Sequence, residues 1–213
     1  MPSGLFVAHH AGGTEALDRA VEDVEDDQVT GAAEACTLSG DDIAVGIAAS
    51  GRTPYVVGAL RESRARRAHT VLVSSNPDAE AAELADVHVC VDTGPEVLAG
   101  STRMKAGTAQ KLVLNSFSTA VMVRLGHTYA GLMTGVVAKN AKLQGRMVGI
   151  LAQATGLDLD TCAEVLDDSG RDLRLALVRL LGDVDVARAR AALDASDGVV
   201  RGALQLLTTD GAH

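Results

Sequence analysis

The alternation of short β-branched segments with helical segments constrains the fold of this chain more than any other feature. Four segments are apolar, rich in β-branched residues and bounded by turn residues: GLFVAHH (4–10), DIAVGIA (42–48), HTVLVSS (69–75) and VHVCV (87–91). Runs of this length and composition predict strands. Helical stretches between such strands are typical of βαβ units and a parallel sheet. We therefore predict an α/β fold, a parallel sheet flanked by helices in three layers (αβα).

The pattern becomes helical after Ala106. One set of apolar residues recurs at helical spacing and predicts a buried core helix: Ala109, Leu112, Val113, Phe117, Ala120, Val121 and Leu125. A second helix is predicted over residues 135–155, because Gly156 suits a helix C-cap.

The remaining segment, Leu157 to Leu207, is rich in Leu, Ala, Asp and Arg. It predicts three short amphipathic helices with turns near Gly170 and Gly182. We therefore predict two domains, an α/β domain over residues 1–153 and a small all-α domain over residues 154–213.

Composition excludes several classes of partner. A net charge of −9 with 2% aromatic residues offers neither the positive field nor the stacking surface that nucleic acid requires. The longest apolar region, residues 112–125, is interrupted by polar residues and is too short to span a membrane. The N-terminus shows no signal-peptide pattern. Three widely spaced cysteines form no metal-ligand cluster and fit a reducing cytoplasm.

The loop after the second predicted strand combines small, hydroxyl and cationic residues: Ser50, Gly51, Arg52 and Thr53. In parallel sheets, ligands bind at the carboxyl ends of strands, where helix N-termini present unpaired N–H groups to anions. Glycine allows close approach of the backbone, and arginine adds fixed charge. The loop therefore predicts a phosphate site. The alternative is an ordinary helix N-cap before Pro54.

A second loop of this kind lies just before the predicted core helix. The segment GPEVLAGSTRMKAGT (94–108) places two neighbouring hydroxyl residues beside two cations: Ser101, Thr102, Arg103 and Lys105. Two such loops in an acidic chain indicate that they bind the same anion, because local positive groups must overcome the overall field. The alternative is that Arg103 and Lys105 are solvated surface charges.

An acidic run, residues 22–27, ends a predicted helix over residues 14–27. Leu17, Val21 and Val24 would form its apolar stripe, with Glu25 beside the stripe and Glu22 turned toward solvent. Glu25 is thus the candidate acid–base group, and a solvated helix end is the alternative. His9 and His10 are adjacent in a predicted strand and would point to opposite faces, so we predict no metal site.

Three segments carry a resemblance to a known family: AVEDVEDD, DDIAVGIAASGRTPYVVGAL and GPEVLAGSTRMKAGTAQKLVLNSFSTAVMVRLG. They are similar to the N-acetylmuramic acid 6-phosphate etherases, members of the sugar isomerase (SIS) domain superfamily. The resemblance runs from about Gly4 to the C-terminus. It implies a cytoplasmic, homodimeric lyase without a cofactor that releases D-lactate from its sugar phosphate in cell-wall recycling, and it places a catalytic glutamate at Glu25.

The family pattern also includes segments that the printed sequence does not contain. Before the part that resembles Gly4 onward, the family has a phosphate loop, GTGTS, and a segment, ECPPT, whose glutamate serves as the acid. We expect roughly a quarter of the family's chain to precede this sequence. A misplaced start codon, a fragment and a diverged homologue are three explanations. A non-catalytic sugar-phosphate sensor is therefore the alternative function.

Overall fold

The computed structural model describes residues 4–136, 138 and 140–210. Contacts divide the chain into a unit that ends at Ser116 and a unit that begins at Phe117. We call them the sheet unit and the helical unit and describe each by itself. The domain boundary expected between residues 153 and 154 stays a prediction.

The sheet unit contains three parallel strands in the order β1-β2-β3. They are β1 (Ile43–Ile47), β2 (His69–Ser74) and β3 (Val87–Cys90). Ile43 pairs with His69, and Val71 pairs with Val87. Helix α3 (Pro54–Ala65) makes the crossover between β1 and β2. The three strands predicted within residues 42–91 and the parallel sheet are thus confirmed.

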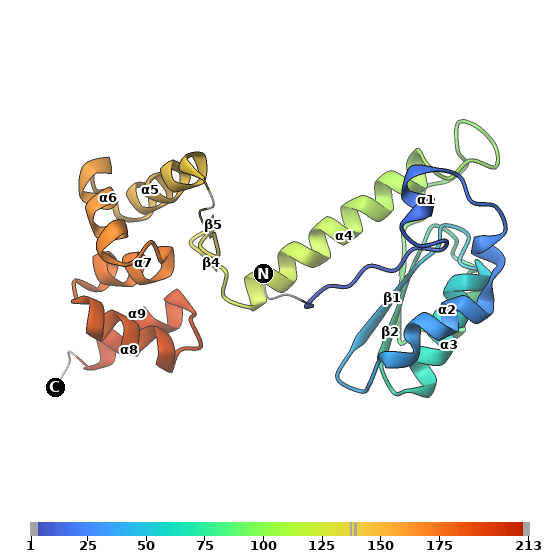
Figure 1. Cartoon of the computed structure of the whole chain (residues 1–213), viewed down its shortest axis with the longest axis horizontal. Helices are drawn as coiled ribbons and strands as arrows, with labels where there is room; N and C mark the ends of the chain where they lie inside the picture. Colours follow the sequence, from blue (N-terminus) through green and yellow to red (C-terminus); the bar gives the residue numbers. More distant parts are fainter. Residues whose placement is uncertain (1–3, 137, 139, 211–213) are drawn as a thin grey trace. The chain divides into compact units, whose positions relative to one another are not determined.

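Glycines bring the layers of the sheet unit close together. A Cβ on Gly46 of β1 would lie 2.7 Å from Val56 of α3, so the strand backbone touches the helix side chains. Helix α2 (Gln28–Glu34) lies on the outer side of α3 (Figure 1). There a Cβ on Gly31 would lie 2.0 Å from the carbonyl oxygen of Tyr55. Only a residue without a side chain fits at such distances.

The first strand predicted from the sequence, residues 4–10, is wrong. The described part of this segment forms turns and coil, and Leu5, Phe6 and Val7 are 42%, 42% and 69% exposed. A strand needs a neighbouring backbone to complete its hydrogen bonds, and the sheet of the described chain starts at β1.

The helix predicted over residues 14–27 is also wrong in extent. It is replaced by α1 (Glu15–Asp18) and the 3₁₀ turn η1 (Val24–Asp26). Arg19 is extended, with φ −140° and ψ 157°, and Asp23 is left-handed, with φ 62°. Two more 3₁₀ turns complete the unit: η2 (Ala35–Thr37) and η3 (Glu80–Leu84).

Helix α4 (Lys105–Arg124) confirms the helix predicted after Ala106 but not its burial. Ala106 is 3% exposed, whereas Leu112 and Val123 are 57% and 50% exposed. The periodicity predicted a buried apolar face, whereas Leu112, Phe117 and Leu125 of that face are 57%, 38% and 44% exposed. These side chains are therefore not part of a core. The division between the two units falls within this helix.

The helical unit begins with the last part of α4, followed in its described residues by a short antiparallel pair and five helices. The elements are β4 (Thr128–Tyr129), β5 (Leu132–Met133), α5 (Ala141–Thr155), α6 (Leu159–Asp168), α7 (Leu173–Gly182), α8 (Val186–Ala195) and α9 (Val200–Asp210). Their core is formed by side chains with no exposed surface, among them Met147, Leu151, Leu175, Leu177 and Val178.

Two predictions for this unit need correction. Helix α5 begins at Ala141 instead of residue 135, because Asn140 caps it; Val137 and Lys139 lie outside the described residues. Gly156 closes α5 with φ 77°, as predicted. The segment after residue 157 holds four helices instead of three, because the left-handed pair Asp197 and Gly198 separates α8 from α9.

Four successive helices in this unit start with the same kind of cap. An Asn or Asp side chain at each N-cap accepts a hydrogen bond from a backbone N–H in the first turn, which satisfies a donor that the helix leaves unpaired. The capping residues are Asn140, Asp158, Asp172 and Asp185. Among the described helices, we find none with the length and apolar character needed to cross a membrane.

Candidate functional site

The loop between β1 and α3 requires glycine at Gly51, where the backbone is left-handed and no space remains for a side chain. Gly51 adopts φ +67°, and a Cβ at this position would lie 2.2 Å from the Cβ of Ala79. Its N–H donates to the carbonyl oxygen of Ala48 at 3.0 Å. The hydroxyl of Ser50 accepts a hydrogen bond from the backbone N–H of Arg52 at 3.3 Å. The side chains of Ser50 and Arg52 are exposed and accessible to a ligand.

The N-terminus of α3 is the second part of this loop. Thr53 occupies the N-cap position, and Pro54 follows in the first turn, as predicted. The hydroxyl of Thr53 makes no capping hydrogen bond within the described chain. This argues against the ordinary cap as the role of Thr53. An uncapped helix N-terminus beside hydroxyl groups is suited to bind phosphate.

The segment between β3 and α4 is held by Glu96. Its carboxylate accepts hydrogen bonds from the backbone N–H groups of Lys105 and Ala106, each at 3.0 Å. These two bonds, from Lys105 first, lower the pKa of Glu96 below its usual value, and the Lys105 charge adds to the effect. The Lys105 ammonium donates to the carbonyl oxygens of Thr93 and Pro95, both at 2.9 Å.

The α4 N-terminus therefore binds a carboxylate that belongs to the chain itself. The dipole of α4 favours negative charge at this position. Lys105, which the sequence predicts as a substrate ligand, instead binds backbone carbonyl oxygens of its own loop in this structure.

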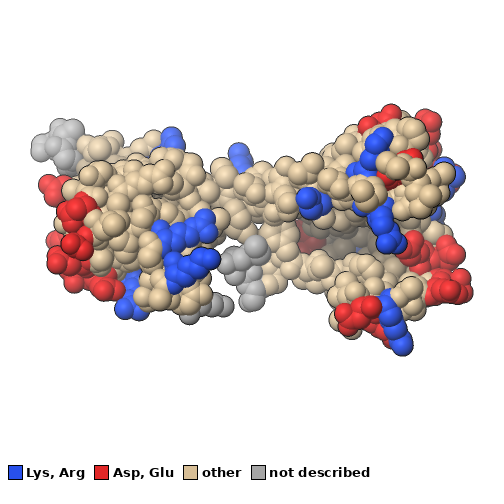
Figure 2. Space-filling view, turned by 90° about the horizontal axis from the view of Figure 1, so that it is seen from above, with Lys and Arg blue, Asp and Glu red and all other residues tan. Residues whose placement is uncertain are grey.

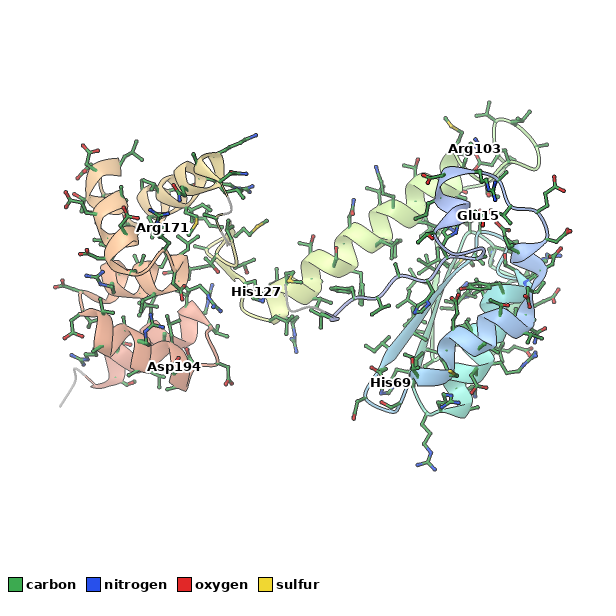
Figure 3. The ribbon with its side chains drawn as sticks, in the orientation of Figure 1. Glu15, His69, Arg103, His127, Arg171 and Asp194 are labelled. Carbon is green, nitrogen blue, oxygen red and sulfur yellow. The ribbon has the colours of Figure 1, made fainter. Side chains whose placement is uncertain are left out.

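The other residues predicted in this segment lie just before α4. Ser101 is half-buried, while Thr102 and Arg103 are exposed. Figure 3 labels Arg103 beside the start of α4 and His69 at the opposite end of the sheet. His69 is the first residue of β2, so Arg103 lies at the carboxyl ends of the strands. The loops after β1 and β3 thus share one edge of the sheet, with the end of β2 between them.

Glu25 belongs to η1, which contacts α3. Its neighbour Val24 packs against the turn at Gly12, where an added Cβ would lie 3.2 Å from a Val24 methyl group. Glu25 itself is exposed, like Glu22. The structure thus places Glu25 on an element next to the helix that follows the Ser50–Thr53 loop, although the long helix used to select it is absent.

Sequence reasoning missed a cluster around Tyr55, at the start of α3. The hydroxyl of Tyr55 donates to a carboxylate oxygen of Glu34, which also lies 3.0 Å from Nδ1 of His9. Burial, followed by the bond to Glu34, raises the pKa of Tyr55. The tyrosine is 7% exposed and joins α2 and the N-terminal segment to α3. The three residues are far apart in the sequence, so no local motif predicts this cluster.

Charged side chains of both signs are interspersed on the face drawn in Figure 2, and acidic side chains gather on both units. Because the net charge is −9, an anionic ligand depends on local groups such as Arg52 and Arg103 for attraction.

Comparison with known proteins places this site in a family. The SIS domain model matches residues 17–120. An N-acetylmuramic acid 6-phosphate etherase from Thermobifida fusca is 61% identical over 175 residues, which are 82% of this chain and 58% of the relative. Another from Pectobacterium atrosepticum is 47% identical over 206 residues, 96% of this chain and 68% of the relative.

A third relative of the same name, from Symbiobacterium thermophilum, is 50% identical over 184 residues, 86% of this chain and 61% of the relative. The chain thus spans 58–68% of the length of these three relatives. Taken with the three parallel strands and the glycine-dependent loop, these matches show that the chain belongs to the N-acetylmuramic acid 6-phosphate etherase family of SIS-domain proteins.

Proposed function

We propose that this chain acts as an N-acetylmuramic acid 6-phosphate etherase, a carbon–oxygen lyase that forms N-acetylglucosamine 6-phosphate and D-lactate. One observation in this family member carries the proposal. The glycine-dependent loop Ser50–Thr53 leads into the N-terminus of α3, where the Thr53 side chain makes no capping hydrogen bond. The relatives' printed names supply the substrate.

The reaction requires a base at one carbon and departure of lactate from the next. With the sugar in its open-chain form, a base removes the proton on C2, which the neighbouring aldehyde makes acidic. The electron pair then forms a C2–C3 double bond while the C3–oxygen bond to lactate breaks, and the departing oxygen takes up a proton to become the lactate hydroxyl. Water then adds across the double bond, with its hydroxyl on C3 and its proton on C2. We assign the base to Glu25, supported by its position on η1 beside α3 and by its family match.

Binding of the sugar phosphate is assigned to the two loops at the sheet edge. Ser50, Gly51, Arg52 and Thr53 would hold the phosphate with backbone N–H groups, hydroxyls and one charge. The second loop would contribute Ser101, Thr102, Arg103 and Lys105, with Lys105 released from its carbonyl partners when the ligand binds. No cofactor or metal takes part in the proposed reaction.

We further propose that the protein is a cytoplasmic homodimer that recycles cell-wall amino sugars. The half-exposed apolar side chains of α4, such as Leu112 and Val123, support pairing with a second copy. The cysteines Cys36, Cys90 and Cys162 are all free, which suits a reducing compartment. Sedimentation equilibrium of the chain measures the state directly, and a monomer at micromolar concentration would refute the dimer.

D-lactate release from N-acetylmuramic acid 6-phosphate tests the function. We would assay the chain as it stands and a fusion with the preceding region of the Thermobifida fusca relative. We expect weak or no activity in the chain alone and activity in the fusion. In the fusion, Glu25→Gln should lower kcat by roughly 10²–10⁴-fold, the usual contribution of an acid–base group.

Glu22→Gln is the matched control, because it removes the same charge from an exposed residue three positions away. We expect it to leave kcat within about twofold of the parent, as a surface change away from the reacting atoms does. Full activity of Glu25→Gln would remove the assignment of the base. Binding of the sugar phosphate without lactate release in any form would favour the sensor over the etherase.

A further inference from the structure

The loop that follows β2 holds the Ser50–Thr53 loop in place. The side-chain amide of Asn76 donates to the carbonyl oxygen of Ser50 at 3.0 Å. The backbone N–H of Ala81 donates to the carbonyl oxygen of Gly51 at the same distance. Two residues of the candidate phosphate loop thus have their carbonyl groups fixed by the neighbouring loop. Asn76 therefore contributes to the position of the phosphate loop through the carbonyl oxygen of Ser50.

Asn76 is itself fixed by Ser74, the last residue of β2. The hydroxyl of Ser74 donates to the carbonyl oxygen of Asn76 at 3.0 Å, and the N–H of Asn76 points back to that hydroxyl oxygen at 3.3 Å. Ser74 is 1% exposed, so water cannot easily replace these bonds.

His88 on β3 completes the arrangement. Its Nε2 lies 2.7 Å from the hydroxyl oxygen of Ser74. A serine hydroxyl has one hydrogen, and the carbonyl oxygen of Asn76 can only accept. When Ser74 gives its hydrogen to the carbonyl oxygen of Asn76, His88 is the donor to Ser74. This arrangement requires a proton on Nε2 of His88.

We propose that His88 is a positioning residue for the sugar-phosphate loop, acting through Ser74 and Asn76 on the backbone of Ser50. The order of donation is His88 to Ser74, Ser74 to the Asn76 carbonyl, and the Asn76 side chain to the Ser50 carbonyl. Its role toward the ligand rests on the proposed function, whereas the hydrogen-bond relay stands on the geometry alone.

Two substitutions at His88 distinguish the loss of its N–H donor from the loss of its side-chain shape. His88→Gln keeps an N–H donor near the place of Nε2, and His88→Leu removes it. The matched control is His69→Leu, a change of the same kind at the opposite end of the sheet, where the side chain is exposed. All variants are made in the 213-residue chain.

The first measurement is amide hydrogen exchange. We expect His88→Leu to speed exchange at Gly51 and Asn76 by roughly five- to tenfold, the effect of losing one hydrogen bond. His88→Gln should restore most of the protection, and His69→Leu should leave it unchanged. Exchange at Leu72, in the middle of β2, reports whether the rest of the sheet unit stays folded. Equal protection in His88→Leu and the parent would overturn the proposal.

The second measurement is the ¹⁵N chemical shift of the His88 ring, which distinguishes its two nitrogens. A protonated Nε2 is expected, and a neutral ring protonated on Nδ1 alone would overturn the relay. In the active fusion, His88→Leu should raise KM about fivefold with little change in kcat, and His88→Gln should reverse the increase. A parent fusion that neither binds nor cleaves the substrate refutes the proposed function, while the exchange and ring measurements still decide the relay.

Discussion

Replacing Gly51 with alanine tests the claim that the candidate phosphate loop depends on this glycine. The new Cβ would lie 2.2 Å from the Cβ of Ala79. Carbon atoms in contact are about 3.5–4.0 Å apart, so the two segments must separate by roughly 1.5 Å. Alanine at φ +67° also enters a region that costs L-residues about 1–2 kcal/mol.

The two effects together set the expected magnitude. Overpacking of a tight site costs about 1–3 kcal/mol, and the lower entropy of an unfolded chain with alanine returns about 0.4–1 kcal/mol. We expect Gly51→Ala to lower the free energy of unfolding of the sheet unit by about 3 kcal/mol, within a usual total of about 5–15 kcal/mol.

Tyrosine fluorescence can follow the sheet unit alone. The chain has two tyrosines and no tryptophan, so Tyr129→Phe leaves Tyr55 as the single reporter. Tyr55 is buried four residues beyond Gly51 and bonded to Glu34, so its emission should change when the unit unfolds in urea. All stability comparisons are made in this background.

Two further variants divide the loss into its causes. Gly13 has φ +63° and open space around an added Cβ, so Gly13→Ala measures the conformational cost alone, about 1 kcal/mol. Ala79→Gly combined with Gly51→Ala removes the overlapping methyl group. The double variant should therefore regain the stability by which Gly51→Ala falls below Gly13→Ala. If Gly51→Ala is no less stable than Gly13→Ala, or the double variant recovers nothing, the reasoning from close approach is wrong.

Two other predictions concern the core and the second loop. Leu151→Ala should lower the stability of the helical unit by about 2–5 kcal/mol in urea unfolding followed by circular dichroism, because it leaves a cavity; exposed Leu159→Ala should change it by less than about 0.5 kcal/mol. Folding lowers the pKa of Glu96, so the stability from its hydrogen bonds to the α4 N-terminus, the Glu96 clamp, is fully present above the ordinary glutamate range. This stability decreases as pH falls through that range toward the lowered pKa. The Ala106 amide resonance should move over that pH range, and Glu96→Gln should abolish the movement; an unchanged titration would refute the clamp.

Segments with strong local signals were predicted from the sequence. The strands within 42–91 are short apolar runs between turn residues, and the C-cap at Gly156 needs only a residue that tolerates a left-handed backbone. The break between α8 and α9 was missed although Asp197 and Gly198 form a dipeptide typical of turns. This dipeptide is therefore a local sequence signal for the break between the two helices.

Other features depended on contacts that sequence patterns do not contain. The run from Glu22 to Asp27 looked like a helix end, but like charges three or four residues apart oppose a helix. Asp27 instead caps α2, where Val29 and Thr30 donate to its side chain. The relay from His88 to Ser50 joins residues on or just after three different strands, and the hydrogen bonds of Glu96 require a folded loop. The predicted site residues were selected by type, whereas the groups that hold them in place emerge only from the fold.

The repeated Asn and Asp caps of the helical unit have a consequence for the order in which the chain folds. Each cap bonds to a backbone group two or three residues away, so the start of α5, α6, α7 and α8 is encoded within a single turn. Pairing of Ile43 with His69 instead requires a crossover of a whole helix to close before the first ladder bond forms. Chains rich in local contacts fold faster than those that depend on distant pairings. During synthesis the sheet unit leaves the ribosome first, yet the helical unit should reach its native packing sooner after its last residue emerges.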